Sequence, residues 1–330
     1  MTDLSNRFES QIQNSKFKIQ NSLEAQFQPM DFNLHLASNS EAIVKAAQTS
    51  FRRFGLPNRT DTPDFTFRLF EHDLDDGQPG EPVFRMEGDL LVQTTGRDST
   101  LAADLSRGFA FGHFSATTLA NPAHFRWHFL ELAFFMMLES RGLMGVHGAA
   151  LAKNGKAILL RGPGGSGKTT LAYAAARSRF QALAEDVVWL DNRRKAWWGM
   201  PWSFHLLPDA KQLFPELAAY SPILQTSGEM KLEVNLEDIR MGSTVFMAQP
   251  GAMVFLERAQ GEKSRLKKIS PAEARQLWPA ARTGLEMKLP HHHEHVEALL
   301  RQNCYRLYNG DDIEAGLDLL ESLFDPLNSK

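Results

Sequence analysis

Cysteine is nearly absent from this chain of 330 residues, in which Cys304 is the only one. A single cysteine excludes an intramolecular disulfide, which fits a reducing compartment or a protein that is indifferent to redox conditions. An unpaired thiol usually behaves as a small buried hydrophobic group. We therefore expect Cys304 to be buried and chemically inert.

Long hydrophobic runs are also absent. The most apolar stretch, residues 128–142, contains Glu131 and Glu139 and is shorter than the about 20 residues that a membrane-spanning helix needs. The N-terminus lacks the basic, apolar and small-residue pattern of a secretory signal. We therefore expect no membrane partner and a cytoplasmic location.

Neither sign of charge is in large excess, because 36 Lys and Arg residues face 39 Asp and Glu residues, for a formal net charge of -3. Without a strong positive field, no general affinity for nucleic acid or anionic membranes is expected. Hydrophobic residues make up 43% of the chain and aromatic residues 10%. This is enough to bury the core of one large domain or of two ordinary ones.

Three regions follow one another along the chain. Residues 1–30 are polar and rich in Gln, Asn and Ser, so we predict a disordered leader. For residues 31–142 we predict a smaller α+β lobe with an antiparallel sheet, because apolar residues alternate with period two between 64 and 116. Residues 143–330 are predicted to form a larger α/β lobe.

Two helices are expected in the smaller lobe. Ser38 and Glu41 have the spacing of a capping box before an amphipathic segment. A second helix is expected to begin at Asn121-Pro122, which suit an N-cap and a first helical position, and to end at Gly142.

A glycine-rich motif lies in the larger lobe. Residues 162–169 read GPGGSGKT, which satisfies the G-x-x-x-x-G-K-[ST] pattern of a P-loop (Walker A). The apolar run 157–160 precedes it and an Ala-rich segment follows it, as in a strand, a loop and a helix. Backbone N–H groups and the helix N-terminus would hold phosphates there. The predicted nucleotide-binding residues are Gly162, Gly164, Gly165, Ser166, Gly167, Lys168, Thr169 and Thr170.

An acidic pair, Glu185-Asp186, stands 17 and 18 residues after Lys168, at the end of the apolar run 180–184. Both acids can serve one site only if the strand ends or bends there, since adjacent strand residues face opposite sides. One acid would steady Mg²⁺ and the other would accept a proton from an attacking hydroxyl. The alternative is one functional acid beside a solvated or salt-bridged neighbour.

His147-Gly148, the motif at 162–169 and the pair Glu185-Asp186 together resemble the catalytic domain of HPr kinase/phosphorylase and its divergent relatives. The resemblance implies a P-loop kinase lobe that uses ATP and Mg²⁺. It implies Glu185 as the base, Asp186 as a metal ligand and His147 as a neighbour of the transferred phosphate, with Lys168 at the phosphates. Thr169 would be the second metal ligand.

The resemblance covers residues 143–200 and has two departures. Glu185 stands where an Asp is usual, and the later segment associated with HPr recognition is absent. We therefore expect transfer of the γ-phosphate to a hydroxyl, on a serine of a protein or peptide other than HPr. The alternatives are a nucleotide-gated ATPase that acts as a binding module, and a small-molecule kinase. The sequence leaves open whether the chain forms a homo-oligomer. No Asn-Lys-x-Asp guanine reader is present, which favours ATP.

Two further features are interpreted without a role in catalysis. The run HHHEH at 291–295 could bind a metal, but a closed zinc site needs four ligands, so a solvated helix start is favoured. Lys231 could contact a phosphate, but an edge position in a strand is favoured.

Overall fold

The computed structural model describes residues 22–56, 62–73, 80–225, 228–278 and 292–324. The chain divides into two compact units, Met1–Met137 and Leu138–Lys330. The sequence had placed this boundary between residues 142 and 143, a few residues later. Each unit contains its own sheet, so each is described by itself.

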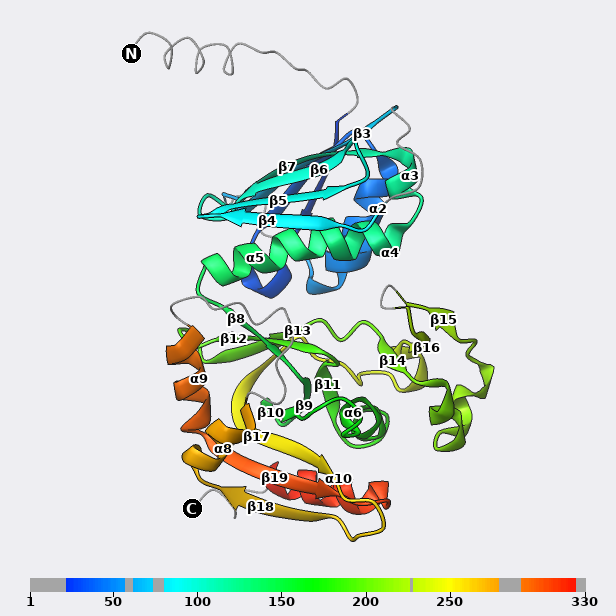
Figure 1. Cartoon of the computed structure of the whole chain (residues 1–330), viewed down its shortest axis with the longest axis vertical. Coiled ribbons are helices and arrows are strands. Elements are labelled where there is room, and N and C mark those ends of the chain that lie inside the picture. The colour runs from blue at the N-terminus through cyan, green and yellow to red at the C-terminus, as the bar shows by residue number, and fades with distance from the viewer. Residues whose placement is uncertain (1–21, 57–61, 74–79, 226–227, 279–291, 325–330) are drawn as a thin grey trace. The chain divides into compact units, whose positions relative to one another are not determined.

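Unit 1 contains one seven-stranded sheet with the order β1-β2-β3-β7-β6-β5-β4 (Figure 1). Its strands are β1 Leu23–Phe27, β2 Leu34–Ser38, β3 Phe65–His72, β4 Val83–Glu87, β5 Leu90–Thr95, β6 Ser99–Asp104 and β7 Phe109–Ser115. β3 pairs in parallel with both β2 and β7, while the other pairs are antiparallel. The prediction of an antiparallel sheet is therefore wrong at β3. The reason is α2 (Glu41–Phe51), which links β2 to β3 as the crossover that parallel pairing requires.

The first strand also corrects the predicted leader. β1 pairs with β2 in the sheet, and the buried Phe27 ring lies 5.9 Å from the ring of Phe51 in α2. Residues 22–30 of the predicted leader are therefore structured, and residues 1–21 lie outside the described residues. A polar composition hid a short strand in which only every second side chain turns inward.

Of the two predicted helix N-caps, one is wrong and one is confirmed. α2 begins after Ser40, and Ser38 lies in β2, where its Oγ accepts a hydrogen bond from the Ser40 N–H at 3.1 Å. The predicted Ser38 cap is therefore wrong. The Asn121 cap is confirmed, because its Oδ1 accepts from the His124 N–H at 3.1 Å.

That second helical segment changes type along its length. It runs through α4 (Pro122–Phe125), a π-helical stretch η3 (Arg126–Glu131) and α5 (Leu132–Ser140). Within the π-helical stretch, buried Glu131 accepts from Ser50 Oγ at 2.6 Å and from Arg126.

Unit 2 is an α/β body around a nine-stranded sheet with the order β11-β9-β10-β17-β13-β12-β8, to which β19 and β18 add beside β17 (Figure 1). The strands are β8 Met144–His147, β9 Ala149–Lys153, β10 Lys156–Arg161, β11 Gln181–Ala184, β12 Val187–Asp191, β13 Ala196–Gly199, β17 Met247–Arg258, β18 Arg265–Ile269 and β19 Asn303–Asn309. β10, β17 and β19 are parallel, so their carboxyl ends meet at one edge. Ligands of open α/β sheets bind at such an edge.

Helices cover both faces of this sheet. Leu160 and Val254 face the core that contains α6 (Lys168–Ala176) and α10 (Ile313–Glu321). The adjacent residues Leu159 and Phe255 face the second core, with α8 (Pro271–Leu277) and α9 (His292–Leu300). Cys304 is buried in the second core, as predicted, and burial raises its pKa to about 11.

A small third sheet, β14 (Phe204–Leu206), β16 (Met230–Val234) and β15 (Ile223–Leu224), joins the α6 side of unit 2. The remaining helical segments are η1 Pro29–Asp31, η2 Arg52–Phe54, α3 Ala116–Leu119, η4 Pro208–Gln212, η5 Pro215–Ala219, α7 Leu236–Ile239 and η7 Ser322–Phe324. In the described part of the chain, no helix has the length and apolar character that crossing a membrane requires.

Candidate functional site

The glycine motif lies between β10, which ends at Arg161, and α6, which begins at Lys168. The strand, loop and helix expected around the motif are all present. Gly165 has φ +75° and Gly167 has φ +89°, left-handed values that side chains rarely adopt. These two glycines let the chain turn tightly into the N-terminus of α6, where unpaired N–H groups and the helix dipole favour an anion.

Lys168 lies across this loop. Its Nζ donates to the carbonyl oxygen of Gly162 at 2.8 Å and to that of Pro163 at 3.1 Å. Burial lowers the pKa of Lys168; the charge of Asp186 acts to raise it, and that of Arg161 to lower it. The lysine therefore lies within the electrostatic influence of Asp186.

The acidic pair follows β11 at the same edge of the sheet as the loop. β11 and β10 both run antiparallel to β9, so they point in the same direction. β11 ends at Ala184. This meets the condition under which both acids can serve one site. Glu185 and Asp186 then each contact a different histidine.

Asp186 is bound to His147, the last residue of β8. The His147 Nδ1 lies 2.9 Å from Asp186 Oδ1, and the Gly148 N–H donates to the Asp186 carbonyl at 2.7 Å. Desolvation acts to raise the pKa of Asp186, but the hydrogen bond and charge of His147 lower it. The charges of Lys231 and Lys168 lower it further, so the net shift is downward. The carboxyl group is thus ionised at neutral pH, and its side chain is 58% exposed.

Glu185 is bound to His205, in the middle of β14. The His205 Nδ1 lies 2.8 Å from Glu185 Oε2. Burial acts to lower the pKa of His205, but the hydrogen bond and charge of Glu185 outweigh it, and the net shift is upward. The Glu185 side chain is 13% exposed and that of His205 is 34% exposed.

His205 was not predicted from the sequence. The only local signal is a polar residue between buried Phe204 and Leu206, which indicates a side chain on the other face of a strand. Nothing in that pattern points to Glu185, 20 residues earlier. The contact depends on the placement of the small sheet, which local periodicity does not encode.

Lys231 belongs to the electrostatics of this site. Its Nζ lies 3.0 Å from Glu229 Oε2. The predicted edge position is wrong, because Lys231 lies in β16, which is paired with β14 on one side and β15 on the other. Its positive charge also acts to lower the pKa values of Asp186 and His205.

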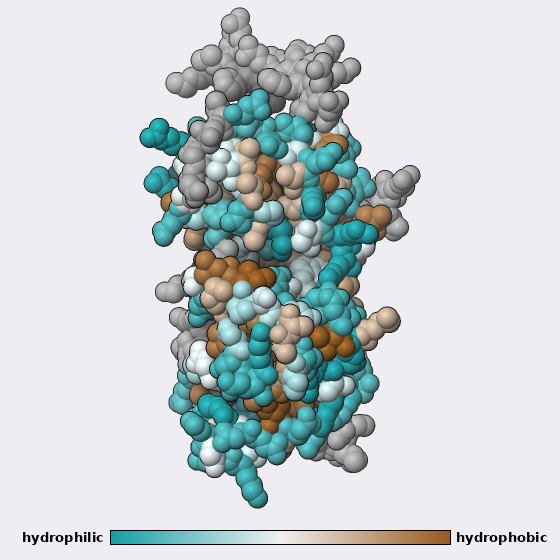
Figure 2. Space-filling view, turned by 90° about the vertical axis from the view of Figure 1, so that its right-hand side faces the viewer, coloured by the Kyte–Doolittle hydropathy of each residue, from teal (hydrophilic) through white to brown (hydrophobic). Residues whose placement is uncertain are grey.

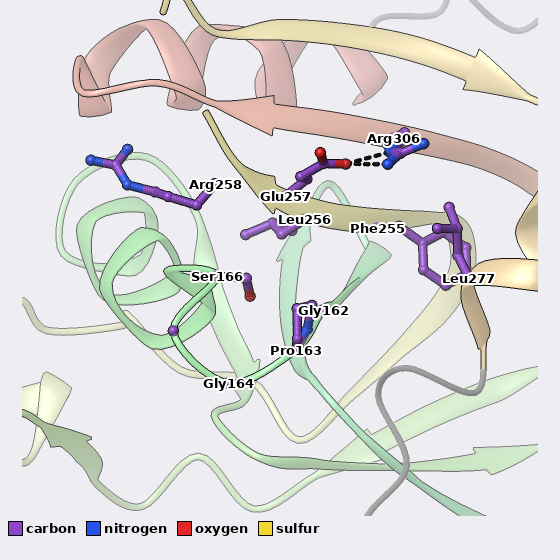
Figure 3. A pocket seen from close by; sticks show the side chains of 11 residues that line it. Gly162, Pro163, Gly164, Ser166, Phe255, Leu256, Glu257, Arg258, Leu277 and Arg306 are labelled. Atoms are coloured by element: carbon purple, nitrogen blue, oxygen red, sulfur yellow. Dashed lines mark hydrogen bonds and ion pairs between the residues drawn. The ribbon is translucent and has the colours of Figure 1, made fainter. Parts of the chain in front are cut away.

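A pocket of about 320 Å³ adjoins the first half of the loop (Figure 3). Its apolar wall comprises Phe255, Leu256 and Leu277, and the loop residues 162–166 form another side. Arg306 points toward Glu257 in Figure 3, and its Nε donates to Glu257 Oε2 at 2.8 Å. The pocket is thus formed by the first half of the loop and by residues of β17, β19 and α8, and neither acid lines it.

The predicted magnesium ligands can be tested against this arrangement. Thr169 is in the first turn of α6, next to Lys168, and Asp186 offers an ionised, exposed carboxylate. One carboxylate and a hydroxyl fit Mg²⁺, which completes its octahedron with water and phosphate oxygens. Among the described residues, no group of three or more His, Cys, Asp or Glu side chains could hold a metal ion by itself. In the HHHEH run, His291 lies outside the described residues, and the Nε2 of His292 lies 3.4 Å from Glu139 Oε2.

No known family model matches the sequence, and no curated protein matches it. Among solved structures, the chain is similar to one described as the Hpr(Ser) kinase/phosphatase from Coxiella burnetii. The identity is 14%, the match covers 54% of this chain and 92% of that chain, and the TM-score is 0.27.

Proposed function

We propose that the chain is a kinase that transfers the γ-phosphate of Mg-ATP to a hydroxyl group, on a serine of a protein or peptide. One observation carries the proposal: a P-loop and two histidine-bound carboxylates share one edge of the sheet. A phosphate-binding loop alone suits any nucleotide-binding protein. A second, differently held carboxylate beside it provides the group that a hydroxyl acceptor needs for its proton.

Each residue of the site has a role in this reaction. The backbone N–H groups of residues 164–169 and the Lys168 ammonium bind and orient the phosphates. Thr169 and Asp186 would hold Mg²⁺, which neutralises charge on the phosphates when bound. His147 fixes the orientation of the Asp186 carboxylate through the 2.9 Å contact. Glu185 and His205 together form the group that removes the proton from the acceptor hydroxyl.

The pocket beside the loop is the proposed seat of the nucleoside. Its volume of about 320 Å³ is at the lower end of ordinary ligand sites, and its walls combine apolar side chains with the Glu257–Arg306 pair. It adjoins the loop at residues 162–166. A nucleotide placed with its base there directs its terminal phosphate toward Glu185 and Asp186.

A polypeptide acceptor is favoured by the small sheet. Ile223 and Leu224 of β15 and Met230 of β16 are exposed. β16 also carries Lys231, which pairs with Ile223. Figure 2 shows the side on which these strands lie in Figure 1, with hydrophobic groups among a mainly hydrophilic surface. Exposed apolar side chains next to a reactive site suit a peptide segment better than a small polar molecule.

The experiment that tests the proposal follows the label of γ-labelled ATP. Purified protein is incubated with Mg²⁺ and a cell extract, and wild type is compared with Lys168→Ala. We expect label on a discrete protein or peptide, reduced at least about 100-fold in the variant because a charged group at the phosphates is lost. A circular dichroism melt of the variant controls for folding.

Other distributions of the label would overturn the proposal. Label found only as free phosphate would identify a nucleotide-gated ATPase or binding module. Label on a low-molecular-weight compound would identify a small-molecule kinase.

A further inference from the structure

In the Glu185–His205 pair, the histidine side chain is more exposed to solvent than the glutamate side chain. The exposed fraction is 34% for the His205 side chain and 13% for that of Glu185. A hydroxyl that approaches from outside therefore reaches the imidazole more readily. This matters because the resemblance noted in the sequence implies Glu185, and not a histidine, as the base.

The hydrogen bond fixes which imidazole nitrogen is available. An ionised carboxylate only accepts hydrogen bonds, so the His205 Nδ1 must donate across the 2.8 Å to Glu185 Oε2. In the neutral ring, the proton is then on Nδ1 and the lone pair on Nε2. A carboxylate that orients a histidine in this way recurs in dyads where the histidine removes a proton from a hydroxyl.

We propose that His205 Nε2 is the general base of the transfer, and that Glu185 is a positioning residue that holds its tautomer and orientation. This inference rests on the proposed kinase function. The acceptor O–H bond breaks and its proton goes to Nε2, while the acceptor oxygen forms a bond to the γ-phosphorus. The bond from that phosphorus to the bridging oxygen breaks, and ADP leaves with the electron pair.

The charges around His205 define the pH at which it acts. Glu185 contacts it from the end of β11, Glu233 lies opposite it across the β14–β16 pair, and Lys231 is on the same strand as Glu233. The two glutamates raise the pKa of His205 and the lysine lowers it, with a net rise from 6.5. A base must be neutral, so kcat should fall as the pH drops through a value above 6.5. A glutamate base would keep kcat constant to a lower pH.

The tautomer can be measured without any acceptor. Long-range ¹H–¹⁵N spectra of protein labelled with ¹⁵N-histidine report which nitrogen carries the proton, and the signal lost in His205→Asn identifies His205. We expect a proton on Nδ1 above the pKa and a pKa above 6.5. A neutral ring protonated on Nε2 would overturn the proposal.

Two variants separate a base from a positioning group once an acceptor has been labelled by the assay above. His205→Asn places an amide N–H where Nδ1 was, so it keeps the donor to Glu185 but removes the base. We expect kcat to fall by about 10²- to 10⁴-fold and the KM for ATP to stay unchanged. The fall of kcat at low pH should also disappear from the pH profile. His293→Gln, at an exposed histidine of α9, is the control and should keep the wild-type pH profile.

The outcomes distinguish this inference from the proposed function. If His205→Asn transfers phosphate at the wild-type rate, Glu185 is the base and the inference is overturned while the kinase stands. If wild-type protein labels no acceptor, the kinase itself is wrong and the base role falls with it.

Discussion

Asp186 and Glu185 are adjacent in the chain, yet the side chain of Asp186 is 58% exposed and that of Glu185 is 13% exposed. The difference arises because β11 ends at Ala184, so the two side chains diverge toward different histidines. An exposed, ionised carboxylate suits a metal ion, and a largely buried one that is bound to an imidazole suits positioning. Neighbouring residues of one charge type thus acquire separate chemical roles.

The pocket beside the loop gives a prediction at the scale of one side chain. Leu277→Trp would fill part of the space between α8 and the loop. If the nucleoside binds there, the KM for ATP should rise about tenfold, which corresponds to about 1.4 kcal/mol, while kcat at saturating ATP changes little. Steady-state kinetics with the labelled acceptor measure both.

Leu277→Met is the matched control, because it keeps the side-chain volume nearly constant and should leave KM unchanged. An equal KM in Leu277→Trp and wild type would place the nucleoside elsewhere.

At the scale of elements, β11 is held by a close approach of β13. A Cβ added at Gly199 would lie 1.7 Å from the Leu183 carbonyl oxygen and 2.6 Å from the Leu183 carbon. Gly199→Ala therefore has to displace one of the two strands. We expect the free energy of unfolding to fall by about 1–3 kcal/mol and the transfer rate to fall with it, since Glu185 and Asp186 directly follow β11.

Urea unfolding measures this effect, with Gly164→Ala as the stability control. A Cβ at Gly164 would meet nothing within 4 Å, and its φ is not left-handed, so its unfolding midpoint should equal that of wild type. Equal midpoints for the two variants would contradict the close approach.

Local signals were sufficient to predict several elements of unit 2. The Asn154-Gly155 turn has φ values of +53° and +75° and joins β9 to β10, and a turn after Asp191 joins β12 to β13. A two-residue turn or a glycine loop is encoded by its own residues.

What the sequence missed depends on partners that are distant along the chain. β1 is stabilised by pairing with β2 and by the ring of Phe51, and the parallel neighbours of β3 are set by a crossover helix. The contact of His205 with Glu185 belongs to the same class. Side-chain periodicity shows which face of a strand is buried, but not which strand lies beside it.

At the scale of the whole molecule, the two units should respond to acid in different pH ranges. In unit 1, burial lowers the pKa of His124, and burial with the charge of His124 lowers that of His128 to about 4. Folding then favours the neutral rings, so unit 1 loses stability as the pH falls from 6.5 toward about 4.

Unit 2 has the opposite arrangement near neutrality. The raised pKa of His205 contributes stability that is fully present below 6.5 and is lost as the pH rises through the folded value. Five carboxyl groups of unit 2 have lowered pKa values, so their contribution is present above about 4.5 and is lost below it. These groups are Asp186, Glu216, Glu237, Glu297 and Glu321.

Calorimetry between pH 7 and pH 5 should therefore show the unfolding midpoint of unit 1 falling while that of unit 2 stays nearly constant. Five of the six tryptophans lie in unit 2 and only Trp127 lies in unit 1, so the fluorescence of Trp127→Phe assigns the transition of unit 2. His128→Gln removes one titrating ring, and should reduce the pH dependence of unit 1 alone. If unit 2 weakened first in this range, the two partly buried histidines, His124 and His128, would not control the acid response of the molecule.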